Sequence, residues 1–479
     1  MSDYLPTIGI ECHVQLKTNT KLFAAVANDA REAPPNTLIS HICLGMPGAL
    51  PVLNGAAVDL AITAAFALGT EPQLFSTFDR KHYFYPDLPK GYQISQLYQP
   101  IILGGYVDIE VDGQPKRIGV TRAHMEEDAG KSTHPTGKNY SLIDLNRAGT
   151  PLLEIVSEPD IKSAVEAKAY AHELYLLMRY AKVSDANLYY GNMRFDVNVS
   201  VSKDPNVLGT RSETKNLNSF RSVEKSVEYE IKRQIEVLES GGEIVQETRG
   251  WDDAKQKTFS QRTKEDAHDY RYFPDPDIPP IVLEQSRIEA ARQAMPVMPS
   301  EVRAKLRELK IDESATETII DELVAAKTML SLMDAGAPQE DIRRIALWLA
   351  GDIQGFIAAD ELLWENLRLD TSALCKLSQL TGQAKVSSTA AKSILMKLIQ
   401  GGGDPESIAK ELDVLQVSDS AELETIVEQT LADNQKAAED VRNGEMKAIG
   451  FLVGQVMKAS KGKANPGVVQ TLIKKRLSA

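Results

Sequence analysis

Strict alternation of apolar and polar residues in two distant segments is the feature that most constrains the fold of this 479-residue chain. Segment 7–16 has apolar side chains at one parity and Glu11 and His13 at the other. Segment 193–201 repeats the pattern, and its polar positions are Arg194, Asp196, Asn198 and Ser200. Successive side chains of a strand point to opposite faces. Each segment is therefore predicted to be a strand with one face on a core and a second, polar face.

Three further segments extend this pattern and predict two antiparallel hairpins, one of 193–201 with 210–216 and one of 106–111 with 116–127. Residues 210–216 alternate again after a loop, and their polar face carries Arg211, Glu213 and Lys215. Segments 106–111 and 116–127 flank Asp112-Gly113, a dipeptide typical of a two-residue hairpin turn. In the second of these segments, Arg122, His124 and Glu126 share one parity.

The polar faces are rich in residue types that bind Mg²⁺ and phosphate. Simple exposure to solvent is the ordinary interpretation of one such face, but Asp and Asn are disfavoured in strands, so Asp196 and Asn198 indicate a functional requirement. Hard cations prefer carboxylate oxygens, and basic groups stabilise a phosphoryl group in transfer. The faces therefore favour an ATP and Mg²⁺ site. The chain has neither GxxxxGK[ST] nor a strand-linked GxGxxG, so the sheet and its loops would hold the nucleotide.

The pattern changes from mixed to helical near residue 300. A capping box at Ser163–Glu166 begins one predicted helix, and an apolar stripe that ends at Gly241-Gly242 marks another. Residues 300–400 are almost wholly helical, and a glycine-rich break at 401–405 precedes a second helical block. We therefore predict an α+β fold with a largely antiparallel sheet, an all-α domain and a small all-α tail, with boundaries at 1–293, 294–402 and 406–479.

Charge is distributed unevenly along the chain. The net charge is −13, yet residues 441–479 hold eight Lys or Arg and one acidic residue, which gives this block +7 and leaves −20 for the first 440 residues. Such a block is either a solvated helical face or a module that confines phosphate contacts to one place.

The three cysteines lie far apart and are expected to be reduced thiols of a cytoplasmic protein. We expect neither a signal peptide nor a membrane span.

Several long strings resemble the GatB family of aspartyl/glutamyl-tRNA amidotransferase subunits, and the resemblance covers the whole chain. They are residues 8–16, 43–51, 79–96, 124–131, 146–154, 215–220 and 268–274, with 454–458 and 461–466 in the tail. The resemblance implies an ATP-dependent carbon–nitrogen ligase that uses Mg²⁺ to phosphorylate the side-chain carboxylate of Glu on tRNA(Gln) or of Asp on tRNA(Asn). Ammonia then displaces the phosphate. It also implies a cytoplasmic heterotrimer with an amidase partner and a small third subunit, and a cradle-like N-terminal domain related in fold to glutamine synthetase.

The resemblance assigns roles to residues of the polar faces and their loops. The expected catalytic residues are Glu11, His13, Arg194, Arg211, Glu213 and Lys215. The expected metal ligands are Glu11, His13, Glu126, Glu127, Asp196 and Glu213. We expect nucleotide contacts from Arg122, Asn198 and Arg249. Loop residues that line the site or a channel are expected to be Arg80, Lys81, His82, Tyr83, Lys90 and Asn146. The expected tRNA contacts in the tail are Lys458, Lys461, Lys463, Lys474, Lys475 and Arg476.

Two alternatives and one departure from the family pattern stay open. A non-catalytic tRNA-binding scaffold is one alternative, although it would not need acids in mid-strand. A related archaeal-type protein is the other, and the chain lacks the large insertion before the helical region that this type carries. Many family members have cysteine pairs near the start that would bind zinc, whereas this chain has Ala24, Ala25 and a single Cys43 there. We therefore expect no zinc.

Overall fold

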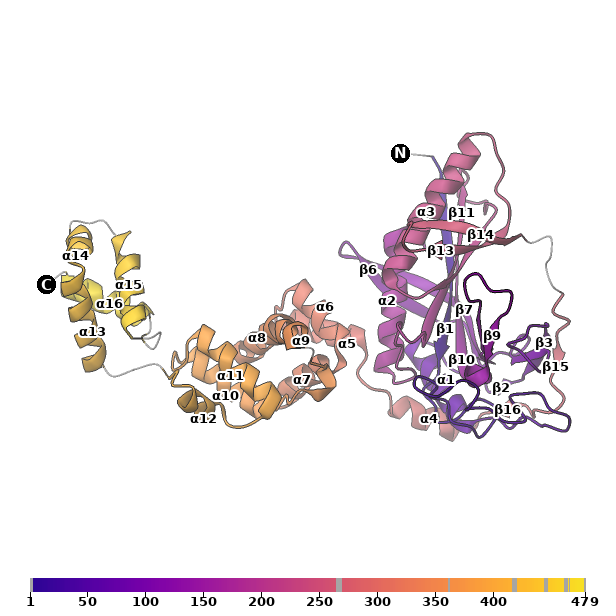
Figure 1. Ribbon diagram of the computed structural model, residues 1–479, viewed down its shortest axis with the longest axis horizontal. Coiled ribbons are helices and arrows are strands. Elements are labelled where there is room, and N and C mark those ends of the chain that lie inside the picture. The colour runs from indigo at the N-terminus through magenta and orange to yellow at the C-terminus, as the bar shows by residue number, and fades with distance from the viewer. Residues whose placement is uncertain are drawn as a thin grey trace. The chain divides into compact units, whose positions relative to one another are not determined.

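The period-two segments pair into one sheet at the centre of the N-terminal unit of the computed structural model (Figure 1). Within the described residues this sheet has nine strands and is antiparallel except between β12 and β13. In spatial order its strands are β14 (Lys257–Thr263), β13 (Glu247–Asp252), β12 (Ser212–Leu217), β11 (Met193–Ser202), β1 (Leu5–Gln15), β10 (Pro151–Ser157), β7 (Gln114–Glu127) and β5 (Ile102–Leu103), with β6 (Tyr106–Val111) also paired to β7. The largely antiparallel sheet predicted from the alternation is confirmed.

The structure describes residues 3–263, 269–360, 362–415, 420–442, 447–460, 464 and 466–477. The chain divides into two compact units, residues 1–299 and 300–479. The finer division at 293/294 and 402/406 stays a prediction.

Helices cover one face of the sheet. α2 (Ala164–Tyr180) and α3 (Phe220–Glu239) lie side by side along it (Figure 1), and α3 contacts β11, β12 and β14. Both predicted helices are confirmed at their N-termini, since Ser163 accepts the amide N–H of Glu166 and Ser219 accepts that of Ser222. The apolar side chains at one parity of the strands pack under these helices, and the polar side chains at the other parity point away from them. The fully buried core side chains include Ile8, Ile10, Met193, Phe195 and Tyr170.

The two predicted hairpins are also confirmed. β6 and β7 pair in antiparallel fashion around Asp112 and Gly113, whose φ values are +52° and +73°. Two successive positive φ values are those of a type I′ turn. β11 and β12 pair in antiparallel fashion too, with a register shift that leaves an extra residue on β12, where Asn216 has a φ of +59°. This bulge turns the end of β12 toward Asp196, because the Asn216 N–H donates to the Asp196 carboxylate at 2.8 Å.

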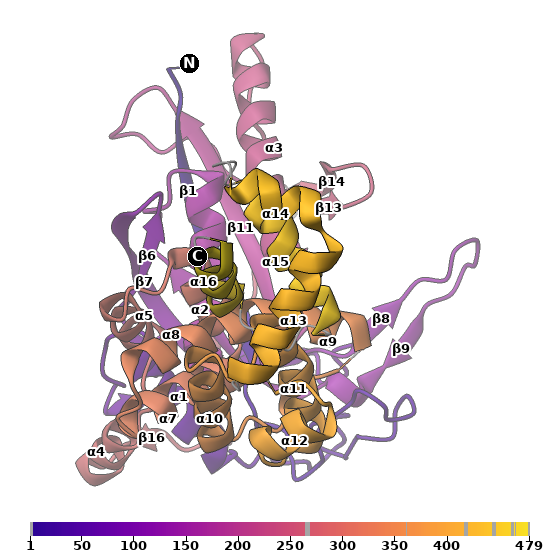
Figure 2. The same cartoon turned by 90° about the vertical axis from the view of Figure 1, so that its left-hand side faces the viewer.

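Small sheets and loops surround the polar face. β3 (Asp79–His82) lies between β4 (Tyr92–Ser95) and β15 (Phe273–Pro274), and β2 (Phe75–Ser76) pairs with β16 (Ile281–Val282). β8 (Lys131–Thr133) and β9 (Leu142–Asp144) form an arm that projects from this unit (Figure 2). α1 (Gly55–Ala67) and α4 (Gln285–Gln293) pack on each other.

The C-terminal unit is helical where the structure describes it. Its first helices are α5 (Pro299–Glu308), α6 (Glu313–Asp321), α7 (Leu323–Asp334), α8 (Gln339–Leu347), a π-helical turn (Trp348–Ile353), α9 (Gln354–Asp360), α10 (Thr371–Gly382), α11 (Ser388–Gly401) and α12 (Pro405–Glu411). α12 follows the glycine-rich break and packs on α10 and α11. The tail helices are α13 (Ser420–Asp433), α14 (Gln435–Arg442), α15 (Ala448–Ala459) and α16 (Pro466–Leu477). They enclose an apolar core of their own that includes Val427, Leu452, Val456, Val469 and Ile473. Among the helices of the described residues, none is long and apolar enough to cross a membrane.

A buried ionic cluster joins α3 to the edge strands. The Glu230 carboxylate is fully buried and accepts the Ser212 hydroxyl at 2.6 Å, and it also accepts the Thr258 hydroxyl. It pairs with Arg233 at 2.7 Å and with Arg249 at 3.0 Å. One carboxylate thus ties α3 to β12, β13 and β14.

Replacing Glu230 should destabilise the N-terminal unit. Glu230→Gln removes the charge that Arg233 and Arg249 share and leaves Arg249 with Glu247 alone, and breaking a buried ion pair costs about 3 kcal/mol. Urea unfolding followed by circular dichroism measures the difference. Burial would raise the pKa of Glu230, but hydrogen bonds from Arg233, Ser212 and Thr258 outweigh it and lower the pKa. The charged carboxylate therefore stabilises the fold at pH values above the ordinary pKa of glutamate. The difference in free energy of unfolding between the unmodified chain and Glu230→Gln should decrease as the pH falls through the lowered pKa.

A matched control lies on the same helix. The Glu228 carboxylate contacts Lys225 at the surface, so Glu228→Gln should leave the unfolding midpoint unchanged. Equal midpoints for the Glu230→Gln variant and the unmodified chain would show that the cluster does not stabilise the fold.

Candidate active site

Strand register brings the predicted polar residues onto one face of the sheet. Across the β1–β11 pair, Glu11 lies opposite Asp196 and His13 lies opposite Arg194. On the other side of β1, His13 lies opposite Glu154 of β10, which in turn lies opposite His124 of β7. Glu213 of β12 lies opposite Asn198 of β11. Opposed residues in a ladder share a face, so polar positions far apart in sequence form one continuous surface.

The first group of ligand-type side chains on this surface consists of Glu11, Asp196 and Glu213. One carboxylate oxygen from each lies within 4.8 Å of the others. The Lys215 ammonium lies between two of them, 2.8 Å from Asp196 and 2.8 Å from Glu213. Asn198 donates its amide to Glu11 at 3.1 Å. The β12 bulge orients this group, because it turns Lys215 and the Asn216 N–H onto Asp196.

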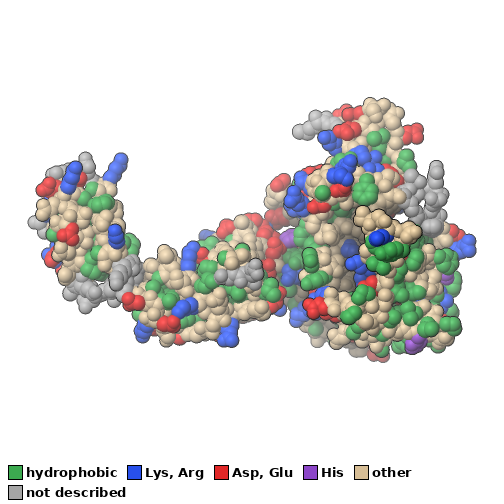
Figure 3. Space-filling model, in the orientation of Figure 1, with side chains coloured by type: hydrophobic (Ala, Val, Ile, Leu, Met, Phe, Trp, Pro, Cys, Tyr) green, Lys and Arg blue, Asp and Glu red, His purple; other side chains and the backbone are tan. Residues whose placement is uncertain are grey.

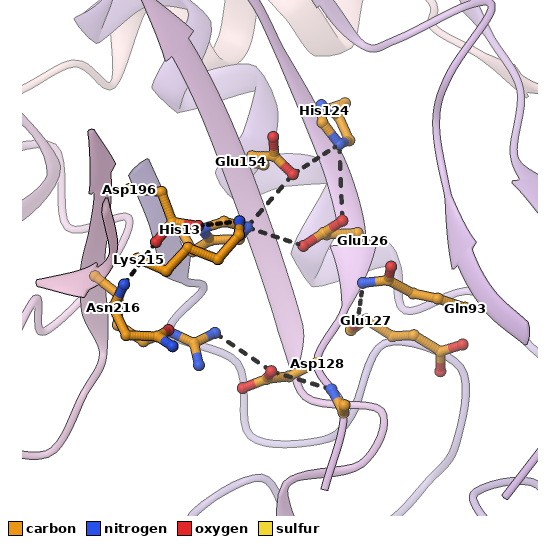
Figure 4. A network of polar contacts seen from close by, with 12 residues as sticks. His13, Gln93, His124, Glu126, Glu127, Asp128, Glu154, Asp196, Lys215 and Asn216 are labelled. Atoms are coloured by element: carbon orange, nitrogen blue, oxygen red, sulfur yellow. Dashed lines mark hydrogen bonds and ion pairs between the residues drawn. The ribbon is translucent and has the colours of Figure 1, made fainter. Parts of the chain in front are cut away.

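The second group consists of His13, Glu126 and Glu154, and its ligand atoms also lie within 4.8 Å of one another. His13 Nε2 is 3.6 Å from Glu126 and 3.4 Å from Glu154 (Figure 4). The buried His124 lies beyond both carboxylates, 3.8 Å from Glu126 and 3.4 Å from Glu154. In Figure 4 His13 of this group lies next to Asp196 of the first group, so the two groups are neighbours.

Burial and mutual charge set the protonation of the two groups. Burial, together with the charge of Glu154, raises the pKa of Glu11. Burial would raise the pKa of Asp196 as well, but the charges of Lys215 and His13 lower it. Burial would lower the pKa of His13, but the hydrogen bond and charge of Glu154 outweigh it and raise the pKa to about 9. His13 is therefore protonated at neutral pH.

The donor sets fit divalent cations. Three carboxylates in the first group suit Mg²⁺, which prefers oxygen ligands and keeps several waters. The second group offers two carboxylates and one imidazole, and a cation bound there would displace the His13 proton. Together the groups place up to five carboxylates and several basic side chains on one surface, which is the arrangement required for a metal-bound polyphosphate.

An arginine pair borders the two groups. The Asp128 carboxylate accepts a hydrogen bond from Arg147 at 2.5 Å and one from Arg194 at 3.3 Å. Burial would raise the pKa of Asp128, but the charges of these two arginines lower it. All three side chains line an open cavity of about 490 Å³. Acidic and basic side chains lie together in the middle of the face of this unit that Figure 3 presents.

Four other predicted site residues differ in how close they lie to the two groups. Arg211 and Asn198 line a cavity of about 220 Å³ that also contains Glu11, so they lie at the first group. Arg122 shares the parity of His124 and donates to the Leu97 carbonyl at 3.0 Å. Glu127 lies outside both groups, because its carboxylate accepts Lys90 and the Ile94 N–H.

Arg249 lies on the opposite face from the two groups. Its register partner is Thr214, which points toward α3, and its guanidinium pairs with Glu230 beneath that helix. Arg249 belongs to the buried cluster under α3, and its expected nucleotide contact stays a prediction.

The predicted loop residues lie near the second group or support the loops around it. Lys81 is close enough to Glu126 and Glu154 for their charges to raise its pKa although burial opposes this, and its ammonium lies 4.9 Å from the centre of the Tyr270 ring. Burial raises the pKa of the Tyr83 hydroxyl, and Glu126 adds to the effect. The remaining contacts are structural: Arg80 pairs with Asp275 and Asp277, His82 stacks on Phe273, Lys90 pairs with Glu127, and Asn146 holds the backbone at Pro34 and Leu38.

Sequence reasoning missed Glu154, Asp128 and Arg147. β10 reads as an apolar run because Leu152 and Val156 share the parity of Glu154, so the alternation is absent there. The one sequence signal is a single carboxylate inside that run. Asp128 and Arg147 lie in loops, where no periodicity could indicate their direction.

The tail residues predicted to contact tRNA are partly described. Lys458, Lys474 and Lys475 are exposed, and Lys and Arg side chains project from the tail in Figure 3. Arg476 pairs with Glu424 and Glu428. Lys461 and Lys463 lie outside the described residues.

Comparison with known proteins agrees with this geometry. The family model of the GatB/GatE catalytic domain matches residues 6–289, and that of the GatB domain matches residues 331–477. The GatB subunit of the aspartyl/glutamyl-tRNA(Asn/Gln) amidotransferase of Carboxydothermus hydrogenoformans is 44% identical over 100% of both chains. Proteins of the same name from Persephonella marina (45%, 99% of this chain and 100% of the relative) and Halalkalibacterium halodurans (46%, 97% of each) are similar. The chain therefore belongs to the GatB family of aspartyl/glutamyl-tRNA(Asn/Gln) amidotransferase subunits.

Proposed function

We propose that this chain is the ATP-using subunit of a tRNA-dependent amidotransferase. It phosphorylates the side-chain carboxylate of Glu on tRNA(Gln), of Asp on tRNA(Asn), or of both, and ammonia then converts the acyl phosphate to the amide. The observation that carries this function is one sheet face with two carboxylate groups, Glu11–Asp196–Glu213 and His13–Glu126–Glu154, bordered by Lys215 and Arg194.

The chemistry explains why such a surface is needed. A free carboxylate resists attack by ammonia because its leaving group would be oxide. Transfer of the terminal phosphoryl group of ATP to a carboxylate oxygen gives an acyl phosphate and ADP, and attack by ammonia then releases phosphate. Both steps concentrate negative charge, so preorganised cations determine the rate. Lys215, Arg194 and Arg211 would hold the phosphoryl oxygens and the substrate carboxylate, and Arg122 and Asn198 would contact the nucleotide.

Mg²⁺ fits this surface by its donor chemistry. Glu11, Asp196 and Glu213 would hold one ion, and His13, Glu126 and Glu154 would hold a second. When bound, Mg²⁺ supplies positive charge that screens the phosphates of ATP from the carboxylate they react with. The second group extends the set of ligands expected from the sequence by Glu154, and Glu127 is left out because Lys90 and the Ile94 amide already bind it.

The proposed function also implies partner subunits and a role for each domain. Ammonia would come from an amidase partner, with a small third subunit completing a cytoplasmic complex, since mischarged tRNA and ATP are found there. The N-terminal unit would be the cradle-like, glutamine-synthetase-related domain, and the helical domain and tail would engage tRNA. No zinc is needed near the start of the chain, because the buried Lys21 ammonium bonds the carbonyls of Leu38 and Ala148 beside the Cys43 thiol.

Neutralising the first carboxylate group tests catalysis against a scaffold role. Glu213→Gln and Asp196→Asn should each reduce ammonia-dependent amide formation by about 100-fold or more, with tRNA affinity unchanged. The assay uses the reconstituted complex, ATP, Mg²⁺, ammonium chloride and each mischarged tRNA in turn. Glu236→Gln, on the exposed surface of α3, is the matched control. Full activity in both site variants would favour the scaffold.

Glu154 provides a separate test of the second group. Glu154→Gln should raise the Mg²⁺ concentration for half-maximal amidation by about tenfold or more, since the ligand loses its negative charge and one of its two oxygens. The neighbouring Glu158→Gln should not, because that carboxylate accepts the Thr121 hydroxyl at the surface. An unchanged Mg²⁺ requirement in Glu154→Gln would remove Glu154 from the metal site.

Removing the tail tests tRNA docking. A chain that ends at residue 419 keeps α12 on α10 and α11, and it should bind tRNA more weakly and with a shallower dependence on salt. Lys474→Gln combined with Lys475→Gln should lower the slope of log affinity against log salt by about 2. Equal affinity and slope in the shortened chain would rule out the docking role of the tail.

A further inference from the structure

Two adjacent tyrosines are exposed beside the candidate active site. Tyr189 is 88% exposed and Tyr190 is 53% exposed, and their rings meet edge to face with centroids 5.2 Å apart. The turn that carries them is well defined, because Asn187 accepts the Tyr190 N–H at 3.2 Å and Gly191 has a φ of +69°. The turn leads directly into β11. Aromatic rings held in solvent by an ordered turn indicate a binding surface.

The surroundings of the two rings are cationic. Both line the cavity of about 490 Å³, together with Lys131, Arg147 and Arg194. The Arg31 guanidinium, which pairs with Asp29, lies 5.7 Å from the Tyr190 ring centre. Asp87 and Asp128 also line the cavity, but Asp128 is already paired with Arg147 and Arg194. Aromatic faces among basic side chains are the combination that binds single-stranded nucleic acid.

The cavity is continuous with the catalytic surface. Arg194, one of its lining residues, lies opposite His13 in the ladder. Asn216, another, donates its N–H to Asp196. A ligand that occupies the cavity therefore reaches the ladder partner of His13 and a residue that bonds Asp196.

We propose that Tyr189 and Tyr190 form a stacking surface for the unpaired nucleotides at the 3′ end of the aminoacylated tRNA. The inference rests on the proposed function. The reacting carboxylate belongs to an amino acid esterified to the terminal ribose, so the last nucleotide must lie within one amino-acid length of the carboxylate groups. Its base offers a face for stacking, and Arg147 and Lys131 are placed for the adjoining phosphates.

A protein partner fits this surface less well. The core of a protein–protein interface gathers apolar side chains and is depleted of charge. Among the described lining residues, the aliphatic ones besides glycine are Ala129 and Leu188, and the others are polar, charged or the two tyrosines.

The test uses the complete complex with its partner subunits. The tRNA substrate carries 2-aminopurine in place of its terminal adenosine, and stacking quenches the fluorescence of this base. Binding to the unmodified complex should quench the signal. Tyr189→Ala and Tyr190→Ala should each lose the quench and raise KM for the mischarged tRNA by about tenfold, with kcat retained. Tyr189→Phe and Tyr190→Phe should behave as the unmodified enzyme. Tyr98→Ala, at an exposed tyrosine outside the cavity, is the control.

Each other outcome overturns the inference. If the alanine variants keep the quench and the KM, the tyrosines do not stack on the tRNA end. If they fail to co-purify with the partner subunits, the surface binds protein. The quench requires no turnover, so it tests stacking even when the unmodified complex forms no amide. Absence of amide with both mischarged tRNAs is the separate result that rejects the proposed function.

Discussion

The pairing of β1 with its two neighbours is the constraint on which the candidate site depends. β1 runs between β11 and β10, and its register places Glu11 against Asp196 and His13 against both Arg194 and Glu154. A slip of one residue would turn every polar side chain of β1 into the core. The apolar side chains of β1 prevent that slip, because it would remove them from the core. Those buried on the helix-covered side are Ile8, Ile10, Cys12 and Val14. The hydrophobic core thus determines the position of each ligand on the opposite face.

Bringing carboxylates together has an electrostatic cost that the chain offsets with its own cations. In the first group Lys215 contacts Asp196 and Glu213, while the pKa of Glu11 is raised. In the second group a protonated His13 lies between Glu126 and Glu154. The surface is therefore stable before substrate binds, and its cations are already placed where phosphoryl oxygens would bring negative charge. Preorganisation of this kind is what lets a site stabilise charge without rearranging during the reaction.

Parity could be predicted from the sequence, whereas register and contact could not. Alternation in β1, β11, β12 and β7 indicated which side chains share a face, and the structure confirms these faces. Which strands are neighbours depends on long-range pairing that no local pattern encodes, so the convergence of Glu11 with Glu213 required the structure. Glu154 was missed because apolar residues flank it on its own face. The face on which Arg249 lies could not be predicted, because its short strand contains Gly250 and shows no alternation of apolar and polar residues.

The two faces of β12 connect the buried cluster under α3 to the catalytic surface. Ser212 and Thr214 point toward α3, and the Ser212 hydroxyl donates to the fully buried Glu230. Glu213 and Lys215 alternate with them and point toward the carboxylates. Any shift of β12 that moved Glu213 would also have to break the hydrogen bonds and ion pairs of Glu230, which join α3, β13 and β14 to the same strand. Compared with apolar residues of similar volume, a buried ion pair contributes little net stability, but here it fixes an edge strand whose other face must hold a carboxylate in place.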